Sequence, residues 1–348
     1  MSDHKRPTIR DVAREAHVSI ATVSRAISDS DYPMNDALRE RVRVVAGELG
    51  YHPSVAAQML RQDASRDICL IVPNISNPYY LQALRGINAV VSEKDYMFVL
   101  CNSEREAQRE HEYLRLLYQR QCLGAIISSV DTSPDTINQY VEKGMKIVLL
   151  DQQLRGAKCP TIRFDSRGSG ELAASYLVTL GHRKIAFATM PLSRWTRQEI
   201  YHGYQDALIS AGVMPDDSYL FVADPPNDSY GGDIELTAGA NIAAEFIAHR
   251  CDATAILCIN DMVAFGVLQT LLQNGVRVPD DVSVMGFDDV PFAGVYSPAL
   301  TTVRYPSEQT GRFAAMMLMD SISSNKGLDT LEMQLTPQLV VRQSTKAR

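Results

Sequence analysis

The chain has 348 residues, of which 45% are hydrophobic and 22% charged, and its formal net charge is −7 at pH 7. This length and composition suffice for two or three domains with substantial cores. No run of about eighteen apolar residues occurs and no hydrophobic segment follows the N-terminus, so we expect no membrane span, no secretory signal and a cytoplasmic protein. The six cysteines form no Cys-x-x-Cys pair, so we expect neither a disulfide framework nor a metal or cofactor.

Residues 8–27 have the pattern of two short helices joined by a short turn. Apolar residues recur at three- and four-residue spacing in the first half, which predicts a helix over residues 9–16 capped by Thr8. Ser19 can cap a second helix over residues 20–27. Small and polar groups near a helix start, followed by one arginine, suit a helix in the major groove of DNA. The alternative is a helical hairpin that packs on another part of the chain.

A third helical pattern completes this N-terminal part. It begins at Asn35 or Asp36 and ends at Gly50, with its apolar residues on one stripe. Three short helices around one small core predict a compact head. After the break at Pro53, residues 54–60 favour one or two helical turns, and so short a helix is marginal in water on its own.

From residue 67 onward, short apolar runs alternate with helical patterns. The predicted strands are residues 68–72, 97–101, 125–127, 146–150, 185–188, 219–222, 255–258 and 284–287. The predicted helices are residues 79–92, 105–121, 136–142, 166–180, 196–210, 236–248 and 262–273. Continuous apolar strands between helices are typical of parallel strands buried on both faces. The expected fold class is therefore α/β, with two successive doubly wound parallel sheets behind the three-helix head.

The charges are unevenly distributed between these parts. Residues 1–62 hold nine basic and eight acidic residues, which leaves 25 basic and 33 acidic residues in the body. The nearly neutral head permits DNA binding without requiring it. We expect a single head to bind weakly and with a clear dependence on salt.

The order of these motifs resembles the lactose/galactose repressor (LacI/GalR) family of transcriptional regulators. The resemblance rests on residues 8–27, 50–53 and 56–60 in the head and on residues 77–79, 181–183, 260–261, 278–283, 286–289 and 298–303 in the body. So long an ordered set is specific to the family. It implies a helix-turn-helix head, a hinge, and a two-lobed core with the fold of periplasmic sugar-binding proteins.

The resemblance also implies domain boundaries. They are residues 1–50 for the head, 51–66 for the hinge helix and linker, and 67–348 for the effector-binding and dimerisation core, with lobe one at 67–164 and 293–325 and lobe two at 165–292 and 326–348. The chain would cross between the lobes near Asp165, near Val290 and near Ser324. A ligand should lie between the lobes, outside the carboxyl ends of the strands.

Candidate DNA contacts lie on the second helix and in the hinge. The candidates for base edges are Ile20, Ala21, Thr22 and Arg25, and those for phosphates are Ser19, Ser24 and Tyr51. Arg25 would choose among bases through its forked donors. The resemblance implies that Leu60 enters the minor groove from a hinge helix that forms on specific DNA, and the alternative is a linker residue on the body surface.

Candidate effector contacts come from the strand ends and from the resemblance. They are Tyr80, Asp165, Arg194, Trp195, Thr196 and Asp261. The carboxylate of Asp261, just past a strand, can accept two hydrogen bonds from a ligand, and the residue can also cap the next helix. Tyr80 can instead be a core tyrosine, and Asp165 can instead hold a crossing. The pair Asp288-Asp289 suggests catalytic carboxylates, but its position near a crossing favours a structural role.

One loop departs from the family pattern. Residues 223–233 form a longer connection than usual, rich in Pro, Asn and Gly, and Ile234 stands where purine repressors carry an aromatic residue. This weakens a purine assignment. Tyr230 in the loop can replace the missing ring or can lie in an ordinary surface turn.

Together these features predict a homodimeric repressor of a pseudopalindromic operator, controlled by a small polar effector, with a sugar preferred and a nucleoside second. An activator, or a catabolite regulator with a protein co-effector, would fit the same motifs. An enzyme is disfavoured because the sequence lacks a Gly-x-Gly-x-x-Gly loop after the first strand, a phosphate loop and a nucleophile elbow. A sugar-transport receptor would need an export signal.

Overall fold

The computed structural model describes residues 7–27, 33–51, 67–94, 96–223, 234–324 and 330–348. The chain divides into two compact units, Met1–Ser65 and Arg66–Arg348. Among the helices in these ranges, none is both long and apolar enough to cross a membrane.

The described part of the first unit contains three helices, α1 (Ile9–Glu15), α2 (Ile20–Ile27) and α3 (Asp36–Glu48), close to the predicted ranges. They share a small apolar core. Its buried members are Val12, Ala13, Ala16, Val23, Ala26, Val42 and Ala46. Each helix is too short to be stable by itself, so this core makes their folding mutually dependent.

Capping residues set the helix boundaries of the head, as predicted. The Ser19 hydroxyl accepts the backbone N–H of Thr22 at 3.1 Å, at the start of α2. The Asn35 side chain accepts the N–H of Ala37 at 2.9 Å, at the start of α3. Gly50 follows α3 with a φ of +63°, in the left-handed region where glycine lacks the Cβ penalty.

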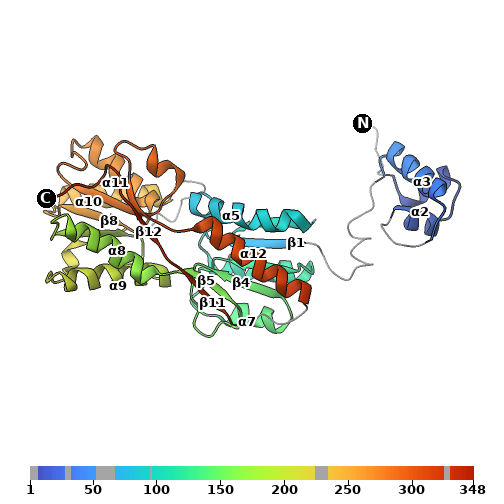
Figure 1. Ribbon diagram of the computed structural model, residues 1–348, viewed down its shortest axis with the longest axis horizontal. Coiled ribbons are helices and arrows are strands. Elements are labelled where there is room, and N and C mark those ends of the chain that lie inside the picture. Colours follow the sequence, from blue (N-terminus) through green and yellow to red (C-terminus); the bar gives the residue numbers. More distant parts are fainter. Residues whose placement is uncertain (1–6, 28–32, 52–66, 95, 224–233, 325–329) are drawn as a thin grey trace. The chain divides into compact units, whose positions relative to one another are not determined.

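Lobe one of the second unit is built on a six-stranded sheet in the order β2-β1-β3-β4-β5-β11, with all neighbours parallel. Its strands are β1 (Asp67–Val72), β2 (Met97–Asn102), β3 (Gly124–Ile127), β4 (Lys146–Leu150), β5 (Thr161–Phe164) and β11 (Glu332–Leu335). Its helices are α5 (Pro78–Val91), η1 (Ser92–Lys94), α6 (Ala107–Gln119), α7 (Asp135–Glu142) and α12 (Ser307–Ser324). The helices α5 and α12 cover one face and α6 and α7 the other (Figure 1).

Lobe two repeats this plan in the order β7-β6-β8-β9-β10-β12, with β12 antiparallel to β10 and the other neighbours parallel. Its strands are β6 (Ile185–Thr189), β7 (Leu220–Val222), β8 (Ala255–Cys258), β9 (Ser283–Asp288), β10 (Thr301–Arg304) and β12 (Gln338–Val340). Its helices are α8 (Ser166–Thr179), α9 (Trp195–Ser210), η2 (Asp217–Tyr219), α10 (Ile234–Ala248), α11 (Asp261–Gln273) and η3 (Pro291–Gly294). The pairs α8/α9 and α10/α11 lie on opposite faces of the sheet (Figure 1).

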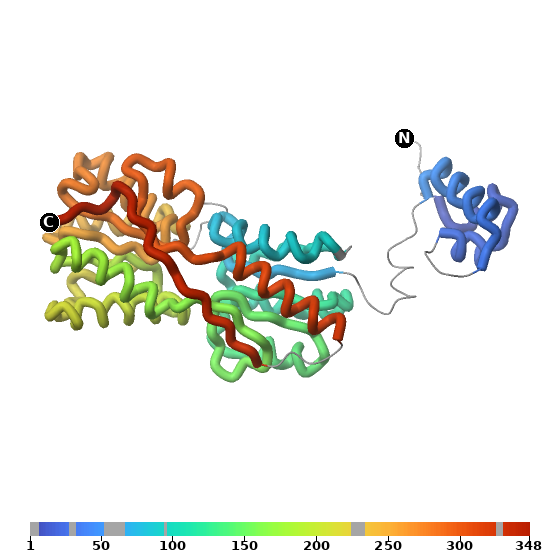
Figure 2. The backbone as a smooth tube through the Cα atoms, in the orientation of Figure 1, coloured from blue at the N-terminus to red at the C-terminus, as the bar shows by residue number. Residues whose placement is uncertain are grey.

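The chain crosses between the lobes three times, but two crossings differ from the expectation. The first, between β5 and α8, lies at Asp165 as predicted. The second falls at residues 305–306 rather than near Val290, because η3 and β10 still belong to lobe two. The third falls at residues 336–337 rather than near Ser324, and Figure 2 shows it as the red tube that runs from one lobe to the other.

The late third crossing follows from the pairing of β11. This strand adds to the edge of the first sheet, in parallel register with β5 from Glu332 opposite Thr161 to Leu335 opposite Phe164. Its residues alternate between exposed and half-buried, as in an edge strand. Nothing in such a short strand indicates which of two sheets it will join.

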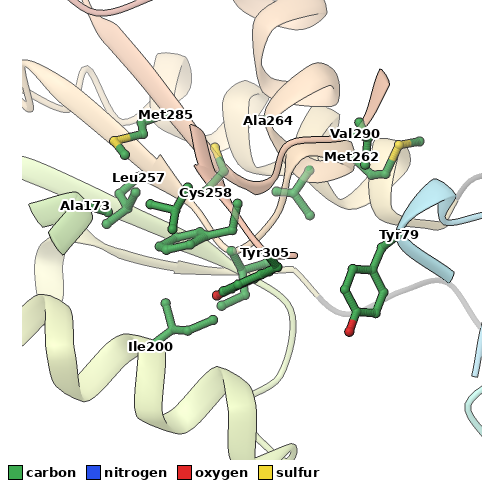
Figure 3. Close-up of a cluster of buried hydrophobic side chains, with 14 of the residues drawn as sticks. Tyr79, Ala173, Ile200, Leu257, Cys258, Met262, Ala264, Met285, Val290 and Tyr305 are labelled. Carbon is green, nitrogen blue, oxygen red and sulfur yellow. The ribbon is translucent and has the colours of Figure 1, made fainter. Parts of the chain in front are cut away.

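One hydrophobic core runs through the crossings from lobe to lobe. The ring of Tyr305 stacks on Phe164 with centroids 4.3 Å apart and lies 6.4 Å from Phe287. Tyr79 of α5 meets Phe164 edge-on at 6.1 Å. Figure 3 shows Tyr305 within this cluster, with Ile200 below it and Tyr79 beside it. The aromatic contacts therefore form an apolar floor beneath the cleft between the lobes.

Glycines allow the paired helices to approach closely. A Cβ on Gly203 in α9 would lie 1.9 Å from the carbonyl oxygen of Arg167 in α8. Gly86 in α5 is placed in the same way against the backbone of Glu308 in α12, at 1.9 Å. Neighbouring backbone, rather than a flexible side chain, occupies the space, so the helices would have to separate to admit a methyl group.

We expect Gly203→Ala to lower the free energy of unfolding by about 1–3 kcal/mol, because it overpacks the contact between α8 and α9. Urea unfolding of the full chain measures this loss. Gly294→Ala is the control, since the nearest atom to its new Cβ would be the Arg342 Nε at 3.9 Å. Equal stability of the two variants would contradict the close approach.

Candidate functional site

The exposed face of α2 carries the residues predicted to read DNA. Ile20, Ala21 and Arg25 are exposed and Thr22 is half-buried, whereas Val23 is buried in the head core. Ile20 leaves 45% of its surface accessible, which is unusual for an isoleucine in a small core-forming helix. The structure thus presents the expected side chains on α2 outside the head core.

The other predicted DNA contacts differ in burial and in the hydrogen bonds that they make. Ser19 is exposed, but its hydroxyl caps α2 and lies 2.8 Å from that of Thr22. Ser24 is half-buried on the same helix. Tyr51 packs against the head core, and its N–H bonds to the carbonyl of Ala46 at 2.8 Å. Residues 52–66 of the hinge, which include Leu60, lie outside the described residues, so their roles stay predictions.

Two arginines of α3 serve the head rather than a ligand. Arg41 donates to the carbonyl of Ala16 at 3.2 Å and Arg43 to that of Ala26 at 3.2 Å. Both carbonyls lie at helix C-termini, where the helix dipole favours a positive charge. In the sequence these arginines appear only as part of the positive charge of the head. In the structure their hydrogen bonds join α3 to α1 and α2.

A polar cavity of about 70 Å³ lies between the lobes, at the carboxyl ends of the parallel strands. Residues from both lobes line it. They are Asn77, Tyr79, Tyr80, Asp151, Ser166, Arg194, Thr196, Arg197, Ile200, Glu235, Ile259, Asn260, Asp288 and Tyr305. The strand-end rule therefore predicted the location of this cavity correctly.

Glu235 of α10 joins the two lobes beside the cavity. Its carboxylate accepts Arg105 at 2.9 Å and the Asn77 amide at 3.0 Å, both from lobe one. The ion pair is well shielded, since the Arg105 and Glu235 side chains are 16% and 6% exposed. Removal of one partner would leave a buried charge uncompensated, so this contact favours the closed arrangement of the lobes.

A second set of hydrogen bonds crosses the cleft near α9. Gln152 donates to the hydroxyl of Thr196 at 3.0 Å. Arg194 donates to the hydroxyl of Ser128 at 3.4 Å, and Ser128 lies 3.3 Å from the hydroxyl of Tyr80. Three of the predicted effector contacts, Tyr80, Arg194 and Thr196, thus lie together in the cavity wall.

Burial perturbs the acids of the cavity. It raises the pKa of Asp151, although the Arg194 guanidinium and a hydrogen bond from Gln152 oppose the rise. Burial, with repulsion from Asp261, Glu235 and Asp151, raises the pKa of Asp288 well above its usual range. Both acids have left-handed backbones, with φ of 68° at Asp151 and 107° at Asp288. Strained backbone and shifted acids at one place are typical of a functional site.

The other three predicted effector contacts do not line the cavity. The Asp261 carboxylate is fully buried, where it accepts the hydroxyl of Thr302 at 2.6 Å and the N–H of Val290 at 3.0 Å. Asp165 accepts the N–H of Gly168 at 2.9 Å as the cap of α8. Both acids therefore use their oxygens within the chain, near the crossings.

Trp195 is also absent from the cavity lining. Its ring lies under the guanidinium of Arg163, 5.2 Å from the ring centroid, in a cation–π contact. Arg163 belongs to β5 of lobe one, so this contact is another bridge between the lobes.

Sequence reasoning missed several residues of the cavity wall. Asp151 directly follows the predicted strand 146–150, so the rule that ligands bind at the carboxyl ends of parallel strands could have identified it. The pair Asp288-Asp289 was expected to have a structural role, and the two residues differ in the structure. Asp288 lines the cavity, whereas Asp289 accepts Arg304 at 2.6 Å and Arg342 at 2.5 Å within lobe two. The resemblance included Asn77 without giving it a role, and no local pattern pointed to Glu235, whose partners are distant in the chain.

A larger hollow of about 850 Å³ opens at the start of α12, beside the second crossing. Its wall includes the Asp289–Arg304 ion pair, so those charges already have partners. Within the described residues, no group of three or more His, Cys, Asp or Glu side chains is placed to hold a metal ion. The cavity between the lobes is therefore the better candidate for a ligand site.

A helix-turn-helix head attached to a two-lobed core with a polar cleft defines the class of ligand-responsive transcription regulators. Residues 8–54 match the model of the bacterial regulatory proteins of the lacI family, and residues 65–341 match that of the periplasmic binding proteins and sugar binding domain of the LacI family. The chain belongs to the LacI family of DNA-binding transcriptional repressors, whose members are regulators and not enzymes.

Named relatives extend over nearly the whole chain. The ribose operon repressor of Escherichia coli is 31% identical over 340 residues, which is 97% of this chain and 99% of the relative. The repressor PurR of Photobacterium profundum is 29% identical over 340 residues, with 97% and 98% covered. A LacI family regulator from Enterococcus faecium with bound ribose is a structural neighbour, with a TM-score of 0.71, 27% identity and coverage of 81% of this chain and 99% of that one.

The buried Asp261 predicts a specific dependence of stability on pH. Burial raises the pKa of this carboxyl to about 8, so the folded protein keeps a proton that the unfolded chain releases above about pH 4. The contribution of Asp261 to stability is therefore complete below about pH 4 and lost as the pH rises to about 8.

Asp261→Asn should remove this slope, which thermal unfolding between about pH 4 and pH 8 measures. Asp206→Asn is the control, because a hydrogen bond from Arg167 lowers the pKa of Asp206 and its titration falls below this window. An unchanged slope in the Asp261 variant would mean that this carboxyl is ionised in the folded protein.

Proposed function

We propose that this chain is a homodimeric repressor whose two heads bind adjacent half-sites of a pseudopalindromic operator. A small polar metabolite bound between the lobes would control that binding. The observation that carries the proposal is a polar cavity walled by both lobes, in a chain that also carries the exposed α2 face. A ligand in such a cavity has different contacts in open and closed arrangements, so it shifts their populations.

The domain boundaries expected from the sequence are part of this proposal. Residues 1–50 would be the DNA-binding head, residues 51–66 the hinge, and the remainder the effector-binding and dimerisation core. Binding to operator DNA would also make the cytoplasm the site of action. Leu60 would enter the minor groove from the paired hinges, as the family resemblance implies.

Exposed apolar side chains support the homodimer. Met97 and Leu100 on the edge strand β2 are 57% and 41% exposed, and Phe292 and Val295 around η3 are 54% and 77% exposed. Grouped apolar side chains that contact water mark interaction surfaces. A symmetric dimer buries the same surface on both subunits, so both groups are candidates for its interface.

The relatives support a sugar-like effector. The name of the ribose operon repressor and the ribose bound to the Enterococcus regulator favour a small polyhydroxylated ligand. The similarity to PurR keeps a purine or nucleoside as the second candidate. The hydrogen-bonding groups of the cavity wall are of the kind that fixes the orientation of a polar ligand.

Arg25→Ala should weaken binding to the preferred operator by about 5- to 150-fold, because one bidentate contact to a base discriminates by about 1–3 kcal/mol. The operator is first selected from random DNA with the full-length protein, and affinity is then measured by fluorescence anisotropy. Arg115→Ala is the control, since Arg115 lies on α6 of lobe one and bonds to Gln119. Equal operator affinities of the two variants would contradict the assignment of α2 as the reading helix.

Val295→Asp should convert the dimer to monomers, because it puts a charge on an apolar surface that two subunits would bury. Sedimentation velocity measures the change. Met214→Asp is the matched control, since Met214 is 80% exposed and belongs to the segment after α9, not to η3. A dimer that survives Val295→Asp would place the interface elsewhere.

A further inference from the structure

The strained turn at the end of β9 borders two hollows of the core. Asp288 and Asp289 have φ of 107° and 53°, values that residues with a side chain rarely adopt. Their carboxyl groups belong to different walls, because Asp288 lines the inter-lobe cavity and Asp289 lines the larger hollow at the start of α12. The unusual backbone thus sends two neighbouring acids to different places.

Such a backbone conformation persists only where the surrounding structure determines it. Asp288 is held by the sheet, since it is the last residue of β9 and pairs with Arg304 of β10. Val290 is held by its backbone N–H, which donates to the carboxylate of Asp261 at 3.0 Å. Asp289 lies between these two fixed residues, and its side chain supplies a further attachment.

Two arginines hold the side chain of Asp289. Its carboxylate accepts hydrogen bonds from Arg304 at 2.6 Å and from Arg342 at 2.5 Å. Arg342 also donates to the carbonyl oxygen of Leu300 at 2.8 Å, which fixes its guanidinium within lobe two. The side chains of Asp289 and Arg342 are 8% and 20% exposed, so salt screens these charge-assisted bonds only weakly. The side chains of Asp289, Arg304 and Arg342 together form the Asp289 clamp.

The Asp289 clamp lies outside the inter-lobe cavity. Its three residues are absent from the cavity lining, to which Asp288 belongs. Each carboxylate oxygen of Asp289 already accepts a hydrogen bond from an arginine. An effector in the cavity would therefore contact Asp288, and the clamp would act on that effector through the position of Asp288.

We propose that the Asp289 clamp positions Asp288 for effector binding, because it maintains the backbone conformation that keeps the Asp288 carboxyl in the cavity wall. Asp289, Arg304 and Arg342 are then positioning residues that do not touch the effector. This inference rests on the proposed function, which places the effector in the same cavity. Arg304 directly precedes the second crossing, so a movement of the lobes about that crossing would also act on the clamp.

The alternative is that the Asp289 clamp is an ordinary structural ion pair of lobe two. The two roles differ in their consequences for Asp288. Loss of a structural ion pair lowers the stability of the fold and leaves the cavity wall as it is. Loss of a positioning clamp moves the Asp288 carboxyl, so it weakens only the binding that depends on this carboxyl.

Crystal structures of the unliganded full-length protein and its Asp289→Ala variant compare these roles without a ligand. Alanine removes the buried carboxylate, and the side chains of Arg304 and Arg342 are 49% and 20% exposed, so both can reach water. We expect the φ of Asp288 to leave the left-handed region and its carboxyl to leave the cavity wall. Arg342→Gln is the second variant and should move Asp288 less, because Asp289 keeps Arg304 as a partner.

Isothermal titration calorimetry then measures the binding of D-ribose, with adenosine as the second probe. Asp288→Ala and Asp289→Ala should each weaken binding about tenfold or more, because the hydrogen bonds of one carboxyl to the probe are lost. The double variant should bind like Asp288→Ala alone, since the clamp acts through that carboxyl. Arg167→Gln is the control, because it breaks an ion pair on α8 in which Arg167 is 54% exposed, and it should bind like the parent protein.

Two results would overturn the positioning role. One is an Asp288 that keeps its φ and its place in the cavity wall in Asp289→Ala. The other is that Asp289→Ala weakens binding equally in the parent protein and in the Asp288→Ala background. Melting temperatures of the unliganded variants show whether each one folds, and the same criteria apply to Arg342→Gln if Asp289→Ala does not fold. If neither probe binds to the parent protein, the crystal structures decide. The proposed function fails separately, if a bound probe leaves operator affinity unchanged.

Discussion

The stack of Tyr305 on Phe164 is the contact on which the two-lobed structure depends. Phe164 ends β5 just before the first crossing, and Tyr305 forms the second crossing. Because the apolar core continues through these rings, packed side chains join the lobes in addition to the three crossing segments of the chain. The rings also limit the cleft, since Tyr305 is both part of the core and part of the cavity wall. A small shift in this contact therefore changes the shape of the ligand site.

The polar groups above this apolar floor either bond within the chain or line the cavity. Asp261 and Asp289 bond within the chain, where they tie the end of β9 and the start of α11 to β10. Asp151 and Asp288 face the cavity at backbone angles that a residue with a side chain rarely adopts. The surrounding structure maintains this strain, which keeps both acids in the cavity wall.

Local sequence patterns predicted most of the fold. Helix caps such as Ser19 and Asn35, and the left-handed glycine at position 50, act over one helical turn, so they are visible in sequence. The apolar strands are visible for the same reason, since both of their faces are covered. The assignment of residues 332–335 to lobe two was wrong, because β11 pairs with β5, which lies far back in the chain, and edge strands carry little hydrophobic signal.

The site was predictable only in part, for a related reason. Its location follows from the parallel sheets, and Tyr80, Arg194 and Thr196 were expected there. The roles of Asp261 and Glu235 depend on distant partners, Thr302 for the first and Arg105 for the second. A carboxylate after a strand looks the same in sequence whether it binds a ligand or a hydroxyl of its own chain. Tertiary contacts decide between these roles.

The central claim is that occupancy of the inter-lobe cavity and operator binding are coupled. Thermodynamic linkage requires the effector to change operator affinity by the same factor by which operator DNA changes effector affinity. The most direct measurement is therefore the dissociation constant of the effector for the full-length protein, free and saturated with operator. The account predicts a ratio of about 5- to 150-fold, equal to the change in operator affinity at saturating effector. A ratio of one would contradict it.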